Sequence, residues 1–264
     1  MPADLSGRPG TVVITGASTG LGAALAIGYA EPGRVLGLIA RRPDLLQRLA
    51  EACRAKGAEV ITAALDVRDG ASVAAWLGML DARHPIDLAI ANAGVFAGIG
   101  SDGRLESGED VRSLVGTNLE GAILTASAAA ALMRSRRRGH IALVASLAAR
   151  QPLADAPVYS ASKAGLLAYG DALRERLMPE GIRVSIVLPG HIRTAQTARH
   201  HGAMPFIMPA DKAAAIVKAG LDRGRDCIAF PAALVWLIAL GRCLPWRLRS
   251  VIGRSLRFTV DAPE

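Results

Sequence analysis

Tyr159 and Lys163 stand four residues apart in the segment YSASK. Residues with this spacing share one face of a helix, so the lysine ammonium would lie beside the tyrosine phenol. A phenol with an ordinary pKa of about 10 is a weak acid or base at neutral pH, and a neighbouring cation favours the phenolate and lowers that pKa. The pair could therefore exchange a proton with a substrate oxygen, although a surface Tyr and Lys on a helix would look the same.

Two polar residues could assist the pair. Ser146 ends the apolar run HIALVAS, thirteen residues before Tyr159. A strand there would place its hydroxyl at the carboxyl edge of a sheet, where open α/β sheets bind ligands. Asn118 falls in an expected helix, in VGTNLEG. Asparagine is unfavourable in a helix interior, which favours a functional role for it.

Seven short apolar or β-branched runs alternate with amphipathic helical stretches such as residues 43–55 and 71–80. Strands this apolar are buried on both faces, and the alternation predicts an α/β fold with a doubly wound, parallel seven-stranded sheet of the Rossmann type and helices on both faces. We place this domain at residues 1–230 and treat residues 231–264 as an apolar and basic helical tail. The runs cover residues 11–15, 34–40, 59–65, 87–91, 140–146, 183–189 and 226–230.

The first run leads into TGASTGLG, residues 15–22, and a helix is expected from about Leu21. Glycines at Gly16, Gly20 and Gly22 let backbone N–H groups and a helix N-terminus approach a phosphate, because no Cβ blocks the way. A purely structural turn after a strand can look similar. With a strand before it and a helix after it, the turn predicts a pyrophosphate-binding site.

The second run ends in LIARR, where an NAD site would carry Asp or Glu for the ribose 2′-hydroxyl. Ala40 and Arg41 stand there instead. A guanidinium can hold a 2′-phosphate through paired hydrogen bonds, whereas a carboxylate would repel it. We therefore expect NADP rather than NAD as the cofactor, with Ser18 and Arg42 assisting. Arg42 could equally be a solvated loop residue.

The spacing GxxxGxG, with YSASK and the upstream serine, resembles the short-chain dehydrogenase/reductase family. The resemblance implies an NADP(H)-dependent oxidoreductase that interconverts a carbonyl and a secondary alcohol, with Tyr159 as the acid/base. It also implies that Ser146 orients the substrate oxygen, that Asn118 holds a water connected to Lys163, and that Lys163 holds the nicotinamide ribose. These four residues are the expected catalytic set.

The same resemblance covers further cofactor contacts. It implies that Asp66 and the Val67 backbone border the adenine, although Asp66 could instead be a turn or cap residue for the helix starting near Asp69. ANAG, residues 91–94, resembles the family's NNAG, and LPGHIRT, residues 188–194, resembles its PG turn followed by a threonine that meets the carboxamide. No metal site is expected. The expected cofactor-binding residues are Gly16, Ser18, Thr19, Gly20, Leu21, Gly22, Arg41, Arg42, Asp66, Val67, Asn92, Gly94, Tyr159, Lys163, Pro189, Ile192 and Thr194.

The composition of the chain limits the kinds of molecule that it is expected to bind. The net charge of +8 is spread mainly over arginines, and aromatic residues make up only 4% of the chain, without the interleaving of basic and aromatic residues that single-stranded nucleic acids need. Nucleic-acid binding is therefore not expected. Three cysteines without metal-ligand or paired spacing, and no signal sequence at Met1, lead us to expect a cytoplasmic protein. We also expect a homodimer or homotetramer.

The tail leaves two alternatives open. Its apolar run, residues 228–240, is too short to span a bilayer, but the arginines that follow suit an amphipathic helix on an anionic membrane surface. The alternative, slightly favoured, is a helix pair that closes the substrate pocket or packs in an oligomer. Residues 195–209 are the expected lid, and no role is assigned to its histidines, methionines or Phe206.

Three other functions compete with the main prediction, and the first, a membrane-surface protein whose enzyme domain is incidental, depends only on the tail. The second is a nucleotide-binding regulatory protein that has lost turnover, which the presence of both Tyr159 and Lys163 disfavours. The third is an isomerase or epimerase that retains its nicotinamide cofactor, and such enzymes typically carry a longer substrate domain. The substrate itself is not readable from the sequence.

Overall fold

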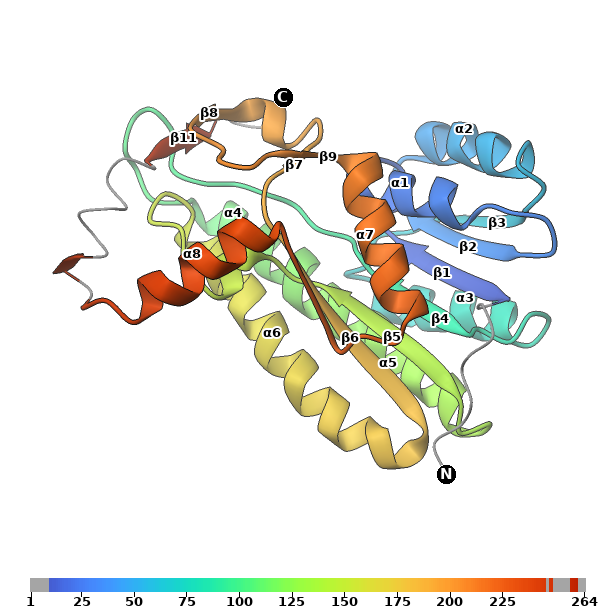
Figure 1. The fold of residues 1–264 in the computed structure, drawn as a ribbon. Helices are drawn as coiled ribbons and strands as arrows, with labels where there is room; N and C mark the ends of the chain where they lie inside the picture. Colours follow the sequence, from blue (N-terminus) through green and yellow to red (C-terminus); the bar gives the residue numbers. More distant parts are fainter. Residues whose placement is uncertain (1–9, 246, 249–256, 261–264) are drawn as a thin grey trace.

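The computed structural model describes residues 10–245, 247–248 and 257–260. Its centre is a seven-stranded parallel sheet with the strand order β10-β6-β5-β4-β1-β2-β3 (Figure 1). The doubly wound Rossmann-type sheet predicted from the alternating pattern is thereby confirmed. The strands are β1 (Thr11–Thr15), β2 (Val35–Ala40), β3 (Glu59–Ala64), β4 (Leu88–Ala91), β5 (Gly139–Val144), β6 (Ile182–Pro189) and β10 (Cys227–Phe230).

The sheet is buried on both faces because alternate side chains enter two separate cores. On β1, Val12 and Ile14 pack into one core and Val13 into the other, and all three are fully buried. The first core is covered by α1 (Gly20–Tyr29), α2 (Pro43–Arg54) and α7 (Ala210–Asp222). The second is covered by α3 (Gly70–Asp81), α5 (Gly121–Arg134) and α6 (Pro157–Leu177). Helix α4 (Gly108–Val115) continues through a π-helical turn, Gly116–Glu120, into α5.

The strand order reverses between β1 and β4, which are neighbours in the sheet. In sheets of this kind a crevice forms at that point, outside the carboxyl ends of the strands. The glycine turn follows β1 directly, the ANAG segment follows β4, and Ser146 follows β5. The topology therefore brings the predicted cofactor and catalytic segments to one edge of the sheet.

Two short strand pairs lie beyond that edge (Figure 1). Strand β7 (Ile192–Arg193) pairs with β9 (Met208–Pro209), and β8 (His200–Gly202) pairs antiparallel with β11 (Phe258–Val260). Three short 3-10 helices complete the list: Leu147–Ala149, Met178–Glu180 and Thr197–Arg199.

The tail begins as predicted and ends differently. Helix α8 (Ala232–Arg242) follows β10, and residues 247–248 are also helical, while residues 249–256 of the expected second helix lie outside the described residues. The sequence did not predict β11, the strand that returns to the sheet edge. Among the helices described, none has the length and apolarity needed to cross a bilayer.

Strand β5 also carries a buried histidine whose titration affects stability. His140 is 9% exposed, and its Nε2 lies 2.7 Å from Ser185 Oγ. Because the Ser185 hydroxyl donates to the Arg225 carbonyl at 2.6 Å, Nε2 is the donor in this pair and the ring is neutral. Burial, assisted by Arg183, lowers the pKa of His140 from 6.5 to about 4.

This burial makes the fold acid-sensitive. Above pH 6.5 His140 is neutral in both states, whereas between pH 6.5 and 4 only the unfolded chain takes up the proton. We expect the free energy of unfolding to fall by roughly 3 kcal/mol across that window on account of this residue. Urea unfolding of His140→Gln, which keeps an N–H donor, should show a shallower acid loss than wild type. His201→Gln, at an exposed site, is the matched control, and identical pH curves for His140→Gln and wild type would contradict the prediction.

Candidate active site

The predicted catalytic pair lies in the first two turns of α6, which begins at Pro157. The Lys163 ammonium is 4% exposed, lies 6.0 Å from the centre of the Tyr159 ring, and donates to the Val144 carbonyl at 2.9 Å. The Ser146 hydroxyl lies close enough to the Tyr159 phenol to lower its pKa. The structure thus brings together the three side chains that the sequence pattern predicts for proton transfer.

Burial, rather than charge, controls the titration of this pair. Desolvation raises the pKa of the Tyr159 phenol above its ordinary value, and the neighbouring Ser146 hydroxyl opposes this shift only in part. Burial also lowers the pKa of Lys163 to about 8. The expectation that the lysine ammonium lowers the tyrosine pKa is wrong for this structure, because both groups are desolvated and the ammonium is directed at the Val144 carbonyl. At neutral pH the phenol is protonated and can donate to a carbonyl oxygen.

Ser146 and one further polar residue, Asn118, hold this arrangement in place. The Ser146 hydroxyl accepts from the Ala148 N–H at 3.1 Å and so caps the 3-10 helix Leu147–Ala149. Asn118 lies in the π-helical turn, is fully buried, and exchanges hydrogen bonds of 2.7 and 2.9 Å with the Val95 backbone. Its amide nitrogen also lies 3.3 Å from Ser162 Oγ. Asn118 therefore ties the segment after β4 to the helix that carries the catalytic pair.

The glycine turn has the geometry of a phosphate site. Gly16 and Gly20 have φ angles of +63° and +56°, and a Cβ on Gly22 would lie 2.3 Å from the Gly16 carbonyl oxygen. Only glycine fits these positions. Thr19 is the N-cap residue of α1, and its side chain makes no capping hydrogen bond. The Thr19 hydroxyl therefore does not accept from the backbone N–H groups of the first turn. Ser18 is half-buried within the turn, and Leu21 is buried in the first turn of α1.

Residues that directly follow strands β4 and β7 border the same glycine turn. The Asn92 side chain donates to the carbonyls of Thr15 and Gly16 at 2.9 and 3.2 Å. A Cβ on Gly20 would lie 3.0 Å from the Thr194 methyl group, and a Cβ on Gly94 would lie 3.5 Å from the Lys163 ammonium. The glycine turn, the segment after β4 and the catalytic lysine are thus neighbours at one edge of the sheet.

The loop after β6 crosses this edge. Pro189 ends β6, and Ile192 is buried on β7. The loop's Gln196 donates to the Gly94 carbonyl at 3.0 Å. This bond connects the expected lid to the segment after β4, and the sequence pattern had not singled out Gln196.

Arg41 and Arg42 follow β2 and are both exposed. The Arg42 guanidinium lies 3.3 Å from Thr19 Oγ1, so it reaches the glycine turn rather than being only a solvated loop residue. Arg41 contributes to the lowered pKa of Asp66, whose main cause is a hydrogen bond from Arg68. Arg42 therefore lies beside the glycine turn and Arg41 near Asp66, and their contact with a 2′-phosphate stays a prediction.

Asp66 adopts a turn and does not cap the following helix. Its carboxylate accepts from the Arg68 backbone N–H at 3.0 Å and pairs with the Arg68 guanidinium at 2.7 Å. Asp69 is the N-cap of α3 and accepts from the Ser72 N–H at 3.0 Å. Val67 is buried beside them. The turn alternative for Asp66 is present in the structure, and its contact with adenine stays a prediction.

An aromatic cluster that sequence reasoning missed covers Tyr159. Phe96 packs edge-on against the Tyr159 ring with 4.8 Å between centroids and lies 6.3 Å from Phe258 of β11. His200 of β8 is buried and stacks on Phe258 at 4.2 Å. The end of the tail therefore packs beside the catalytic tyrosine through strand β11, whereas the pocket-closing alternative had expected a helix pair.

A buried carboxylate holds this part of the tail. Asp155, four residues before Tyr159, is 4% exposed, and it accepts from the Phe258 N–H at 3.0 Å and pairs with the Arg257 guanidinium at 2.8 Å. Its backbone carbonyl accepts from the Ile99 N–H at 2.7 Å. No local pattern in the sequence could have identified Asp155, because its partner lies 103 residues further along the chain.

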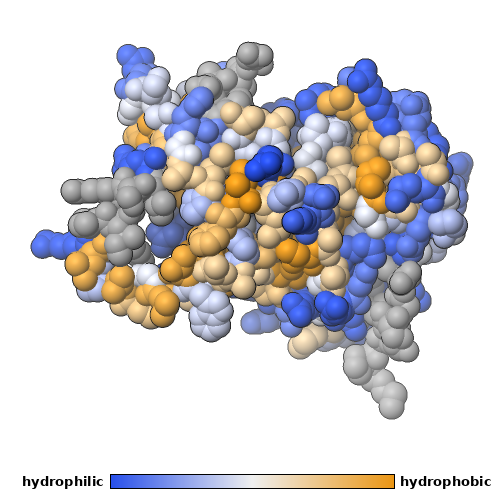
Figure 2. Space-filling view, turned by 45° about the horizontal axis from the view of Figure 1, so that its top comes forward, coloured by the Kyte–Doolittle hydropathy of each residue, from blue (hydrophilic) through white to orange (hydrophobic). Residues whose placement is uncertain are grey.

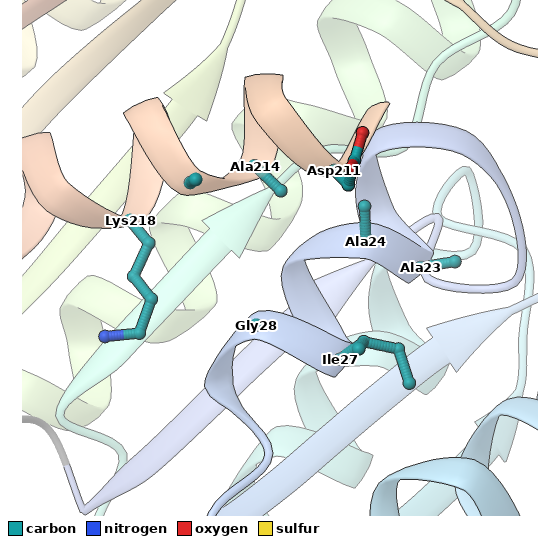
Figure 3. Close-up of a pocket in the computed structure, with 8 residues that line it drawn as sticks. Ala23, Ala24, Ile27, Gly28, Asp211, Ala214 and Lys218 are labelled. Atoms are coloured by element: carbon teal, nitrogen blue, oxygen red, sulfur yellow. The ribbon is translucent and has the colours of Figure 1, made fainter. Parts of the chain in front are cut away.

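One surface groove lies away from the catalytic pair. The groove in Figure 3, of about 450 Å³, runs between α1 and α7 on the face of the sheet opposite α6. Its walls are mainly alanine, and Lys218 at one end pairs with Asp222 at 2.6 Å. It offers no acid/base pair comparable to Tyr159 and Lys163.

Comparison with known proteins agrees with this geometry. The model of the short chain dehydrogenase family matches residues 10–203. An uncharacterised oxidoreductase of Myxococcus xanthus is 36% identical over 94% of this chain and 97% of its own length, and the ketoacyl reductase HetN of Nostoc is 34% identical over 83% and 77%. A short-chain dehydrogenase from Sphingobium yanoikuyae, solved with NADPH, superposes with a TM-score of 0.74 at 28% identity, over 96% of this chain and 98% of that one. Solved structures of this fold contain either NADPH or NAD.

Proposed function

Because this chain belongs to the short-chain dehydrogenase/reductase family and is an oxidoreductase by that relationship, we propose that it interconverts a carbonyl and a secondary alcohol with NADP(H). The observation that carries the proposal is the placement of Tyr159, whose ring centre lies 6.0 Å from the ammonium of the buried Lys163 and whose phenol lies next to Ser146. The glycine turn, which a Cβ at Gly22 would obstruct, fits the pyrophosphate of a dinucleotide.

The glycine turn and Lys163 would hold the dinucleotide, whose nicotinamide would provide hydride transfer to or from the substrate carbon. The Tyr159 phenol gives its proton to the oxygen during reduction and takes it back during oxidation. Ser146 donates a hydrogen bond to the same oxygen as negative charge develops there. The Lys163 ammonium, which donates to the Val144 carbonyl beside the pair, would hold the nicotinamide ribose. Reduction suits the resting protonation state of Tyr159.

The walls of the site favour an apolar substrate. Tyr159 packs with Phe96, Leu153 and Phe258 in one hydrophobic cluster. HetN, one of the relatives, is named a ketoacyl reductase. We therefore propose an apolar ketone, such as a ketoacyl chain or a ring ketone, as the substrate class. A panel of apolar and polar ketones, followed through NADPH absorbance, tests it, and turnover of polar sugars alone would contradict it. The homodimer or homotetramer and the cytoplasmic location stay predictions.

The choice of NADPH depends on Arg41. Replacing it in Arg41→Asp removes a guanidinium partner for the 2′-phosphate and adds a repelling carboxylate. A charge-assisted hydrogen bond contributes about 1.5–3 kcal/mol, so kcat/KM with NADPH should fall by roughly tenfold to a hundredfold. The value with NADH should stay level or rise.

The matched control for this prediction is Arg48→Asp, which makes the same charge change at an exposed position on α2. It should leave both values near wild type. Arg41 does not select the cofactor if wild type has equal kcat/KM values with NADPH and NADH. The same conclusion follows if the ratio of these values in Arg41→Asp is the same as in wild type.

A further inference from the structure

Helix α8 is apolar on two opposite faces. Leu234, Val235 and Ile238 pack inward against the core. On the outer face, Trp236, Leu237 and Leu240 are 69, 56 and 66% exposed. Their positions follow the i, i+1, i+4 spacing of a single helix face, so they form a continuous stripe. The sequence from Ala232 to Gly241 contains no charged residue.

The stripe extends beyond the helix, where Leu244 and Leu248 are 39 and 56% exposed. We refer to Trp236, Leu237, Leu240, Leu244 and Leu248 as the α8 surface. Figure 2 shows hydrophobic residues gathered at the lower left of the molecule, over the outer end of α8. A helix with apolar residues on all sides is normally covered on all sides, and apolar patches of this kind commonly mark contact with a protein or a membrane.

The charged residues in the sequence segment that carries the α8 surface are all positive. From Cys227 to Val260 the sequence contains five arginines and no aspartate or glutamate. Among the described residues, Arg242 ends α8, and Arg247 follows between Leu244 and Leu248; both are exposed. Long arginine side chains can extend from an apolar surface to a polar boundary while their stems stay buried. The complement of such a surface is apolar in its interior and anionic at its edge.

We propose that the α8 surface binds the interface of an anionic lipid bilayer, with Trp236 and the leucines entering the boundary of the acyl chains and Arg242 and Arg247 meeting lipid phosphates. Helix α8 has 11 residues, so it is about 16 Å long, roughly half of a bilayer's hydrocarbon core. It therefore lies in the plane of the interface. Tryptophan is enriched at this depth in membranes because its ring is amphipathic.

A second copy of the chain fits this surface less well. A two-fold dimer places the same patch on both subunits, which would bring the arginines of one copy toward those of the other without a carboxylate between Cys227 and Val260 to compensate. The position of α8 next to the sheet edge that carries the active site also fits binding to a bilayer. The helix packs against the turn after β6, since a Cβ on Gly190 would lie 3.0 Å from Leu234. Binding through α8 would hold the sheet edge that carries the active site close to the membrane.

The test uses the purified full chain and flotation with vesicles of phosphatidylcholine, with or without phosphatidylglycerol. We expect binding to the anionic vesicles, weaker binding in high salt, and little binding to phosphatidylcholine alone. Leu237→Gln/Leu240→Gln and Arg242→Glu/Arg247→Glu should each reduce binding by about tenfold or more. Circular dichroism and NADPH oxidation check that each variant is folded.

Matched controls make the same changes elsewhere. Met79→Gln/Leu105→Gln alters two leucine-sized side chains that are 64 and 74% exposed, and Arg83→Glu/Arg223→Glu makes the same change in net charge. Both should bind vesicles like wild type. The proposal is overturned if wild type fails to bind anionic vesicles or if the α8 variants bind like their controls. It is also overturned if light scattering shows a dimer that only the α8 variants dissociate while vesicle binding is unchanged, because the surface would then be a subunit interface.

Discussion

Tyr159→Phe should lower kcat for carbonyl reduction by about a thousandfold, with a range of roughly 10²–10⁴ that is typical of losing a general acid. The substitution removes one oxygen and leaves the ring, which packs edge-on against Phe96 at 4.8 Å, in place. The phenol next to Ser146 is also lost. The substrate oxygen would then have to take its proton from water or from Ser146, neither of which is as acidic or as well placed.

The measurement is steady-state NADPH oxidation with the best ketone from the panel. Tyr169→Phe is the matched control because Tyr169 lies on the same helix and its hydroxyl makes a hydrogen bond of 3.3 Å with Ser127 on α5. That variant should keep near-normal turnover. NADPH binding, followed by fluorescence, should persist in Tyr159→Phe. Normal turnover by a folded Tyr159→Phe would remove the basis of the proposed mechanism.

The sheet and the glycine turn could be predicted because their signals are local. Each strand of the sheet corresponds to a short apolar run in the sequence. Gly16, Gly20 and Gly22 occupy positions at which positive φ angles or close backbone contacts require glycine. Such positions constrain the residue type directly, so the sequence shows them. The positions of Ser146 and Tyr159 then follow from the topology, since β5 and α6 are adjacent in the chain.

Other features depend on contacts between distant segments. Phe258 reaches the site because β11 pairs with β8 and because Asp155 accepts its N–H across 103 residues. Neither contact leaves a periodic pattern in the sequence. The titration of Tyr159 was also beyond sequence reasoning: spacing shows that Lys163 is near, but only the structure shows how completely burial dominates the pKa of each group.

Asp155→Ala should be the most disruptive change outside the catalytic set. It leaves the Phe258 N–H without its acceptor and removes the partner of Arg257. Hydrogen bonds to a charged group contribute about 1.5–3 kcal/mol each, so we expect the strand β11 to detach in a large fraction of molecules. Because a terminal strand can unfold locally, the global free energy of unfolding should fall by only about 2–3 kcal/mol.

The functional effect should appear in KM rather than in kcat. Detachment of β11 moves Phe258 away from Phe96 and opens the apolar wall beside Tyr159, so KM for an apolar ketone should rise by about tenfold, which corresponds to roughly 1.4 kcal/mol of binding. The proton-transfer groups stay in place, so kcat should change less. Asp155→Asn keeps an oxygen that can accept from the Phe258 N–H and should recover much of the loss.

A double-mutant cycle separates positioning from simple destabilisation. Phe258→Ala should raise KM by itself, without placing an unpaired group in the core. If Asp155 acts by holding Phe258, the double variant Asp155→Ala/Phe258→Ala should have nearly the same KM as either single variant, so that the two effects are strongly non-additive. Fully additive effects, or an Asp155→Ala enzyme with a lower melting temperature and an unchanged KM, would limit Asp155 to a structural role. Faster proteolysis of the C-terminus in Asp155→Ala, compared with Asp155→Asn, would show directly that the carboxylate retains the strand beside the catalytic tyrosine.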